Sequence, residues 1–273
     1  MSTGTPRPQA TSTPLRFRRS AARLTAGQVK NLRDGFRAMQ GINDDRGYGY
    51  HAGIHGLPLP IGCDNAHGSD YFLPWHRAYL YFFERALRDQ VPNAMLTWWD
   101  WRISPQRAAR LPKPFVNKTV DRKPNPLASA GVAPLALQQG GNQVPAKTVR
   151  EPGAPGAPAL PSVQEVGDVL ALSDFVDFSA QLEQLHNRVH GWVGGHMGQI
   201  AYAAFDPIFW AHHCMIDRLW RLWQLRHPGA GPPASILDEA LPPFRMTVRG
   251  TLSVTALGYD YAVASASTQP PTP

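Results

Sequence analysis

The chain of 273 residues lacks the features of several protein classes. It contains only 2 cysteines, too few for a disulfide framework. No apolar run approaches the roughly 18 residues that span a bilayer. The first residues are basic but have no apolar segment behind them, unlike a secretory signal. We therefore expect no membrane partner, and a protein that is either cytoplasmic or exported together with a partner protein.

Acidic residues are also in short supply. The 27 Lys and Arg exceed the 20 Asp and Glu, which gives a formal net charge of +7. Arg16, Arg18, Arg19 and Arg23 gather near the N-terminus, whereas the other charges are scattered and mixed in sign. Nucleic-acid binders instead present a basic stripe interleaved with aromatic residues. The charge indicates a solvated basic surface, and we expect no nucleic-acid partner.

Aromatic residues are plentiful, and apolar residues follow helical spacing in several segments. The 8 Trp, 8 Tyr and 11 Phe supply enough apolar surface to order a globular chain. Apolar residues at three- and four-residue steps predict helices over 25–40, 70–88, 163–172, 178–193 and 206–227. Thr25 is a favourable N-cap for the first helix, and Asp206-Pro207 is a favourable start for the last. The sequence therefore predicts a mainly α fold with little sheet.

The rest of the chain is less regular. Residues 104–163 are rich in Pro, Gly and Ala, which predicts a long irregular surface excursion. Residues 244–261 alternate between apolar and polar positions, as short strands do. Both ends lack apolar anchors, so we expect them to be mobile. The predicted organisation is an N-terminal arm over 1–22, one catalytic domain over 23–262 and a disordered tail over 263–273.

Seven of the 10 histidines fall into three groups. His186 and His190 are four residues apart in a predicted helix, which puts their Cβ atoms about 5–6 Å apart on one face. His212 and His213 lie among apolar residues of the last helix, where a buried imidazole needs a polar partner or a metal ion. His213 is on the inward stripe, so we prefer it to His212 as a ligand.

The third group lies upstream and consists of His55, His67 and His76. A Phe precedes His76 by four residues, as Phe209 precedes His213. Two similar halves with three histidines each predict two metal ions side by side. Six imidazoles without a thiolate or carboxylate cluster favour copper, then zinc, over iron.

Two other metal centres are alternatives at this point. Carboxylate-bridged di-iron bundles need Glu-x-x-His motifs on two helices, whereas Glu183 and His186 supply one. A hydrolytic pair of zinc ions would use the same histidines. Metal content distinguishes this zinc site from a copper site.

Three long motifs resemble the copper-binding signatures of the family of tyrosinases, catechol oxidases and molluscan haemocyanins. They are LHNRVHGWVGGHM, AAFDPIFWAHHCMIDRLW and FLPWHRAYLYFFERAL, and the resemblance extends over 24–261. It implies an antiparallel four-helix bundle around a binuclear (type-3) copper site, with long irregular loops and a few short strands. By this resemblance, one copper is held by His55, His67 and His76, and the other by His186, His190 and His213.

The resemblance also separates His55 from its neighbour His51, because the sequence IHGLP is similar to the family sequence around the first ligand. Glu183 resembles an acid that, with Asn187, orients a water able to deprotonate a phenol. The alternative is that Glu183 is an ordinary acid on a helix surface. Gly191 corresponds to a position at the mouth of the site where relatives often carry a larger side chain, so we expect open access.

Further positions acquire expected roles from the same resemblance. Phe209 resembles a Phe that packs beside the copper pair in the substrate pocket. Cys63 resembles a cysteine that is joined to His67 by a thioether; the alternative is that Cys63 is a free buried thiol. His212 is expected to make a hydrogen bond behind the ligands, and Arg18 to pack near Gly258–Tyr261. Two further histidines are interpreted as surface residues: His196 and His227.

The resemblance implies oxidation of phenols and o-diphenols to o-quinones, with two copper ions as cofactor and O2 as co-substrate. The alternatives are a catechol oxidase without hydroxylase activity, an o-aminophenol oxidase and, from another class, a haemocyanin-like O2-binding unit. The chain continues only briefly after Tyr261. We therefore expect no lid domain over the coppers, and this favours oxidation. A copper-loading chaperone is a candidate partner; the sequence predicts no oligomeric state.

Overall fold

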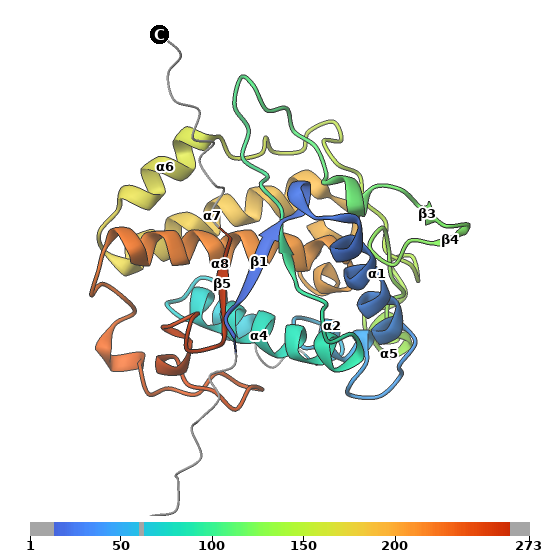
Figure 1. Cartoon of the computed structure of the whole chain (residues 1–273), viewed down its shortest axis with the longest axis horizontal. Helices are drawn as coiled ribbons and strands as arrows, with labels where there is room; N and C mark the ends of the chain where they lie inside the picture. Colours follow the sequence, from blue (N-terminus) through green and yellow to red (C-terminus); the bar gives the residue numbers. More distant parts are fainter. Residues whose placement is uncertain (1–13, 60–62, 263–273) are drawn as a thin grey trace, which may run out of the picture.

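The computed structural model describes residues 14–59 and 63–262, and it is mainly α, as predicted (Figure 1). The four long helices are α1 (Ala26–Gln40), α4 (Phe72–Gln90), α7 (Phe175–Val193) and α8 (Ile208–Arg226). The short helices are α2 (Tyr48–Gly53), α3 (Cys63–Ala66), α5 (Pro134–Gln139) and α6 (Val163–Ala171). Across the described ranges, no helix is both long and apolar enough to cross a membrane.

Side-chain caps explain where the helices begin. Thr25 forms a capping box with Gln28 at the start of α1. Asp174 accepts hydrogen bonds from the backbone amides of Val176 and Asp177, so α7 begins three residues before the predicted position. Asp206 acts similarly for α8, because its Oδ1 accepts from the amide of Ile208 at 3.0 Å.

Helix α4 occupies the centre of the molecule. Its residues Phe72 to Leu80 are buried without interruption, and α4 contacts α1, α7 and α8. Figure 1 shows α7 and α8 running side by side, with α4 next to them and α1 at one end. Aromatic rings fill the contacts between helices; Phe83 of α4, for example, stacks on Trp210 of α8. This packing holds three histidine-bearing helices in fixed relation to one another.

A small parallel sheet crosses the bundle. Strand β1 (Arg16–Ser20) lies between β2 (Thr97–Trp98) and β5 (Tyr259–Tyr261). The predicted strands over 244–261 are therefore wrong except for β5. The apolar residues Phe244, Val248 and Val254 point into the core from consecutive turns and a short 3-10 helix. The buried positions before β5 recur every three or four residues, at 241, 244, 248, 251 and 254, because each turn directs one residue into the core. The alternation in the sequence is therefore not an alternation of burial.

Residues 104–163 are irregular, as predicted, but they are well anchored. They include a 3-10 helix (Lys113–Phe115), helix α5 and an antiparallel pair of β3 (Thr119–Val120) and β4 (Lys123–Pro124). Arg150 forms an ion pair with the buried carboxylate of Asp206, at the start of α8. The excursion is thereby fixed to the helix that carries His212 and His213.

The predicted boundaries at 22 and 263 stay predictions. Residues 16–20 of the expected N-terminal arm form the central strand β1. The two ends that we expect to be mobile lie outside the described residues, except for residues 14 and 15.

Strand β1 also brings a buried charge into the bundle. Arg18 is fully buried and donates to Glu84 of α4 at 2.9 Å and to Asp217 of α8 at 3.1 Å. Tyr259 and Tyr261 of β5 donate their hydroxyl groups to the same Asp217. Burial would raise the pKa of Asp217, but the attraction of Arg77 and Arg18 outweighs it and lowers this pKa. The expected packing of Arg18 near Gly258–Tyr261 is observed.

We predict that Arg18→Ala destabilises the protein strongly. The substitution leaves the Glu84 carboxylate buried with no cation, a loss that typically costs about 3–5 kcal/mol of unfolding free energy. Urea unfolding followed by circular dichroism measures this change. Arg19→Ala on the same strand is the control, because Arg19 is exposed and its loss should cost less than about 0.5 kcal/mol. Equal effects of the two substitutions would contradict the prediction.

Candidate metal centre

Three imidazoles from α7 and α8 converge on one point. The Nε2 atoms of His186 and His190 are 3.0 Å apart, and those of His186 and His213 are 3.2 Å apart. The third distance, between His190 and His213, is 3.3 Å. A point equidistant from three atoms so spaced lies about 1.8 Å from each, close to the roughly 2.0 Å of a metal–imidazole bond. This group fits a metal ion.

A second group of imidazoles adjoins the first. The ring nitrogens of His55, His67 and His76 lie within 4.8 Å of one another. His55 follows α2, His67 follows α3 and His76 is in α4. The ring centroids of His76 and His213 are 4.5 Å apart, so the two groups are neighbours.

Backbone carbonyl groups orient several of these rings. The Nδ1 atom of His190 donates to Met197 O at 2.7 Å, that of His76 to Phe72 O at 2.8 Å, and that of His55 to Ile200 O at 3.2 Å. Each bond places the proton of the neutral ring on Nδ1, so that Nε2 carries a lone pair suited to a metal ion. The Nε2 atom of His76 is buried and has no hydrogen-bond partner among the described residues. A metal ion would supply the missing partner.

Burial keeps these imidazoles uncharged. Desolvation lowers the pKa of His55, His76, His186 and His213 well below the ordinary value, and that of His190 to about 4. The positive charge that neighbouring imidazoles would carry adds to the effect. Neutral imidazole is the form that binds a metal ion, so the site is in its binding form at neutral pH.

His212 is close to this cluster but differs from its members. Its ring stacks on His186 with 5.0 Å between ring centroids, and its nitrogens lie within 4.8 Å of those of the α7–α8 group. Neither nitrogen makes a hydrogen bond of normal geometry with a described residue. The backbone of His186 still acts on this ring, because its hydrogen bond opposes the lowering of the His212 pKa by burial. The hydrogen bond predicted behind the ligands therefore stays a prediction.

Glu183 and Asn187 lie on α7 beside the converging imidazoles. Gly68, directly after His67, donates its backbone amide to both Glu183 oxygens at 2.9 and 3.0 Å. Glu183 is only 6% exposed, so it is not an ordinary acid on a helix surface. Burial raises its pKa, and the bond from Gly68 opposes this shift. Asn187 Oδ1 accepts from His186 Nδ1 at 3.0 Å and fixes the plane of that ring.

A cavity of about 270 Å³ opens onto the histidines. Four residues of the two groups line it, together with Asn187, Gly191, Met197, Gly198 and Ile200. A Cβ atom on Gly191 would come within 2.8 Å of Pro158 Cγ. Pro158 of the excursion therefore packs against Gly191 and leaves little room for a larger side chain at this position. The predicted open access stays a prediction.

Phe209 lies behind the ligands instead of lining this cavity. It is fully buried, and its ring centroid is 4.0 Å from that of His213 and 4.7 Å from that of His55. This position is beside both histidine groups, as expected of a residue packed next to the metal pair. Phe209 does not line the cavity, so this position does not give it direct contact with a substrate there.

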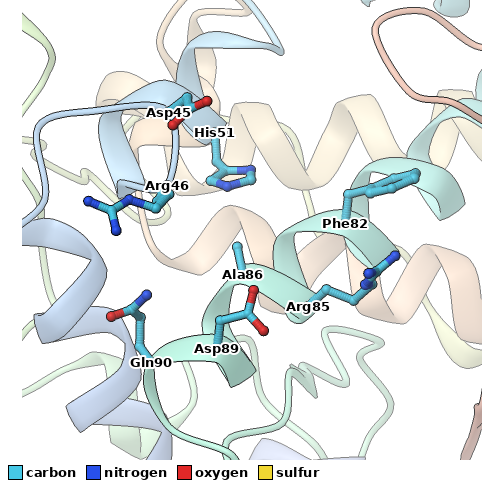
Figure 2. A pocket seen from close by; sticks show the side chains of 8 residues that line it. All are labelled: Asp45, Arg46, His51, Phe82, Arg85, Ala86, Asp89 and Gln90. Atoms are coloured by element: carbon cyan, nitrogen blue, oxygen red, sulfur yellow. The ribbon is translucent and has the colours of Figure 1, made fainter.

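His51 belongs to neither histidine group; Figure 2 shows its ring beside Asp45, Arg46 and residues of α4. It lines a separate cavity of about 320 Å³ with charged residues from the loop before α2 and from the second half of α4. Its ring packs edge-on against Phe83, 5.7 Å between centroids. The geometry supports His55, and not His51, as the candidate ligand. The side chain of Cys63 lies outside the described residues, so the predicted thioether with His67 stays a prediction.

Sequence reasoning misjudged two histidines and missed three backbone groups that hold the site. His196, interpreted above as a surface residue, is 1% exposed, and His227 is half-buried with Nε2 donating to Leu170 O. Met197 and Ile200 act through their carbonyl groups, which no side-chain motif reveals. Gly68 acts through its amide, at a φ of +67° that favours glycine. Only the Gly-rich context of His196 hinted at a special backbone.

Known proteins share these features. Residues 45–226 match the family model described as the common central domain of tyrosinase. The chain belongs to the tyrosinase family. Members of this family hold a binuclear copper centre, and the two histidine groups have the donor set and spacing to hold it. The predictions of family and copper cofactor are thereby confirmed.

Two curated relatives illustrate the range of this family. A tyrosinase of Streptomyces glaucescens is 36% identical over 62% of this chain and 68% of its own length. The haemocyanin β-C chain unit D of Helix pomatia is 33% identical over 80% of this chain. The chain spans only 53% of the length of that second relative.

Solved structures agree on the fold. A functional unit of octopus haemocyanin matches with a TM-score of 0.73 and 28% identity, over 90% of this chain and 68% of that one. A recombinant mushroom tyrosinase matches with a TM-score of 0.76 and 21% identity, over 92% of this chain and 62% of that one. Enzymes and oxygen carriers therefore share this architecture, and the fold alone does not choose between them.

Substitution of the adjacent histidines on α8 should separate ligand from neighbour. We expect His213→Ala to bind about one copper per chain, because it removes one of three converging donors. His212→Ala should still bind two, like the unmodified chain. Copper analysis after gel filtration measures the content. A full copper content in His213→Ala, with a loss in His212→Ala, would reverse the assignment.

The buried His51 should make the metal-free protein sensitive to acid. Burial lowers its pKa from 6.5 to about 4, so the unfolded chain binds more protons between these values. Stability is therefore lost as pH falls from about 6.5 towards 4, by roughly 3 kcal/mol for this residue alone. Urea unfolding of His51→Leu at pH 7, 6 and 5 should show a shallower decline. Tyr50→Leu, at an exposed neighbour, should keep the full decline; an unchanged slope in His51→Leu would contradict the prediction.

Proposed function

We propose that this chain oxidises phenols and o-diphenols to o-quinones with O2. The observation that carries the proposal is the cavity that reaches both histidine groups. His55 and His67 of one group and His186 and His190 of the other line it directly. A single aromatic ring entering from solvent can therefore reach the metal pair, as an oxidase requires and a sealed oxygen carrier does not.

The proposed ligands are His55, His67 and His76 for one copper and His186, His190 and His213 for the other. Their support is the convergence of the ring nitrogens, the burial that keeps the rings neutral, and the carbonyl acceptors that orient them. Phe209 packs against rings from both groups and restricts their movement. The proposed catalytic domain extends over 23–262.

The copper pair, when bound, supplies the electron exchange with O2. The chain supplies the acid–base chemistry. Glu183 receives the phenolic proton through a water shared with Asn187, because its carboxylate is fixed beside His67 by the amide of Gly68. Burial raises the pKa of Glu183, which makes its carboxylate a stronger base than an exposed one. Asn187 can hold that water with its amide NH2, since its Oδ1 already accepts from His186.

Oxygen uptake tests the proposal. Copper-loaded protein is mixed with a monophenol, a catechol or an o-aminophenol, and O2 is followed with an electrode. We expect uptake with the catechol and the monophenol. Uptake with the catechol alone would indicate a catechol oxidase, and a preference for the third substrate an o-aminophenol oxidase. Reversible O2 binding without uptake would support the haemocyanin-like function, which the Helix pomatia relative makes the second candidate.

The same assay tests the role of Glu183. Glu183→Gln keeps an oxygen that can accept from Gly68 but removes the base, so monophenol oxidation should fall by about 10²-fold. Copper content should stay unchanged, and catechol oxidation should fall less. Glu239→Gln at an exposed position is the matched control. A monophenol rate in Glu183→Gln equal to that of the control would rule out this role.

A further inference from the structure

One short loop supplies the hydrogen-bond acceptors for a ligand of each proposed copper. We call residues 195–200 the acceptor loop. Its Met197 carbonyl accepts from His190 at 2.7 Å, and its Ile200 carbonyl accepts from His55 at 3.2 Å. His190 belongs to the α7–α8 group and His55 to the other. The position of this loop therefore controls the orientation of both groups at once.

The acceptor loop is clamped by His196, which does not reach the metal centre. Val149 donates its backbone amide to His196 Nδ1 at 3.1 Å, and the His196 amide donates to the Val149 carbonyl at 3.1 Å. On the far side of the ring, Nε2 donates to Pro145 O at 3.0 Å. Three hydrogen bonds thus join His196 to residues 145–149 of the excursion. The residue is 1% exposed, so water does not compete for them.

The backbone next to His196 allows the acceptor loop to lie this close to Val149. Gly195 has a φ of +55°, and a Cβ atom there would lie 2.2 Å from Val149 O. Only glycine permits such an approach between the acceptor loop and the excursion. The contact is therefore a built feature of the chain and not an accidental meeting of two loops.

We propose that His196 is a positioning residue for the binuclear centre. It holds the acceptor loop against residues 145–149, and the loop in turn holds His55 and His190 in the orientation that binds metal. Its loss weakens both copper positions together, although His196 touches neither. The proposal rests on the ligand assignment of the proposed function and is independent of whether phenols are oxidised.

Copper affinity without any phenol tests this role. Full-length His196→Ala and the unmodified chain are loaded with copper and titrated with a chelator of known affinity, and the copper retained per chain is measured. We expect the affinity of both copper positions to fall by about 10–100-fold, the usual loss when a partner behind a metal ligand is removed. Amide exchange at Met197 to Ala201 should accelerate in the same variant.

His196→Asn keeps the proposal testable if the alanine variant does not fold. Its Oδ1 can replace Nδ1 as the acceptor for the Val149 amide, while the bond to Pro145 is lost. We expect a folded protein with copper affinity between those of the alanine variant and the unmodified chain. Where the alanine variant does not fold, a loss of about 3–10-fold in His196→Asn supports the proposal and an unchanged affinity overturns it.

His227→Ala is the matched control. Its imidazole also donates to a backbone carbonyl, that of Leu170, but it lies at the other end of α8 from His213, about 21 Å along the helix axis. Copper affinity should not change in this variant. Unchanged copper affinity in a folded His196→Ala, or an equal loss in His227→Ala, would overturn the proposal. A chain that binds copper normally but oxidises no phenol would overturn the proposed function alone.

Discussion

The structure depends on the burial of neutral imidazoles in an aromatic helical bundle. Seven histidines lie within the two metal-binding groups and beside them, and each would destabilise an apolar core if its nitrogens stayed unpaired. The bundle meets this constraint by giving Nδ1 of several rings a fixed acceptor, such as Phe72 O or Met197 O. The remaining nitrogens face one another, an arrangement that is favourable only with metal ions between them. Stability and function are therefore coupled at the same atoms.

Fixed geometry also extends to the proposed base. Glu183 is one turn of α7 away from Asn187, and both contact the proposed ligand sets, through Gly68 beside His67 and through His186 Nδ1. Helix α7 thus sets the distance from Glu183 and Asn187 to His186. Tertiary packing sets the distance from Glu183 to His67, through Gly68. Precise placement on rigid elements is what metal-dependent oxidation requires.

The sequence predicted much of the fold because its main signals are local. Helical spacing and caps located α1, α4, α6 and α8 closely, and the spacing of His186 and His190 on α7 identified a metal-binding face. Contacts made by backbone atoms were not predictable, because Gly68, Met197 and Ile200 act through groups that every residue possesses. His196 was misjudged for a related reason. Its burial depends on a segment almost 50 residues away in sequence, which no periodicity reports.

The parallel sheet has a consequence for the order in which the chain can fold. Its central strand is made first during synthesis and its third strand, Tyr259–Tyr261, last. Until that last strand arrives, Asp217 on α8 lacks two of its hydrogen-bond donors. A growing chain can therefore form the helices early, but it completes the hydrogen bonds of Asp217, one turn after His213 on α8, only after residue 261 has been made.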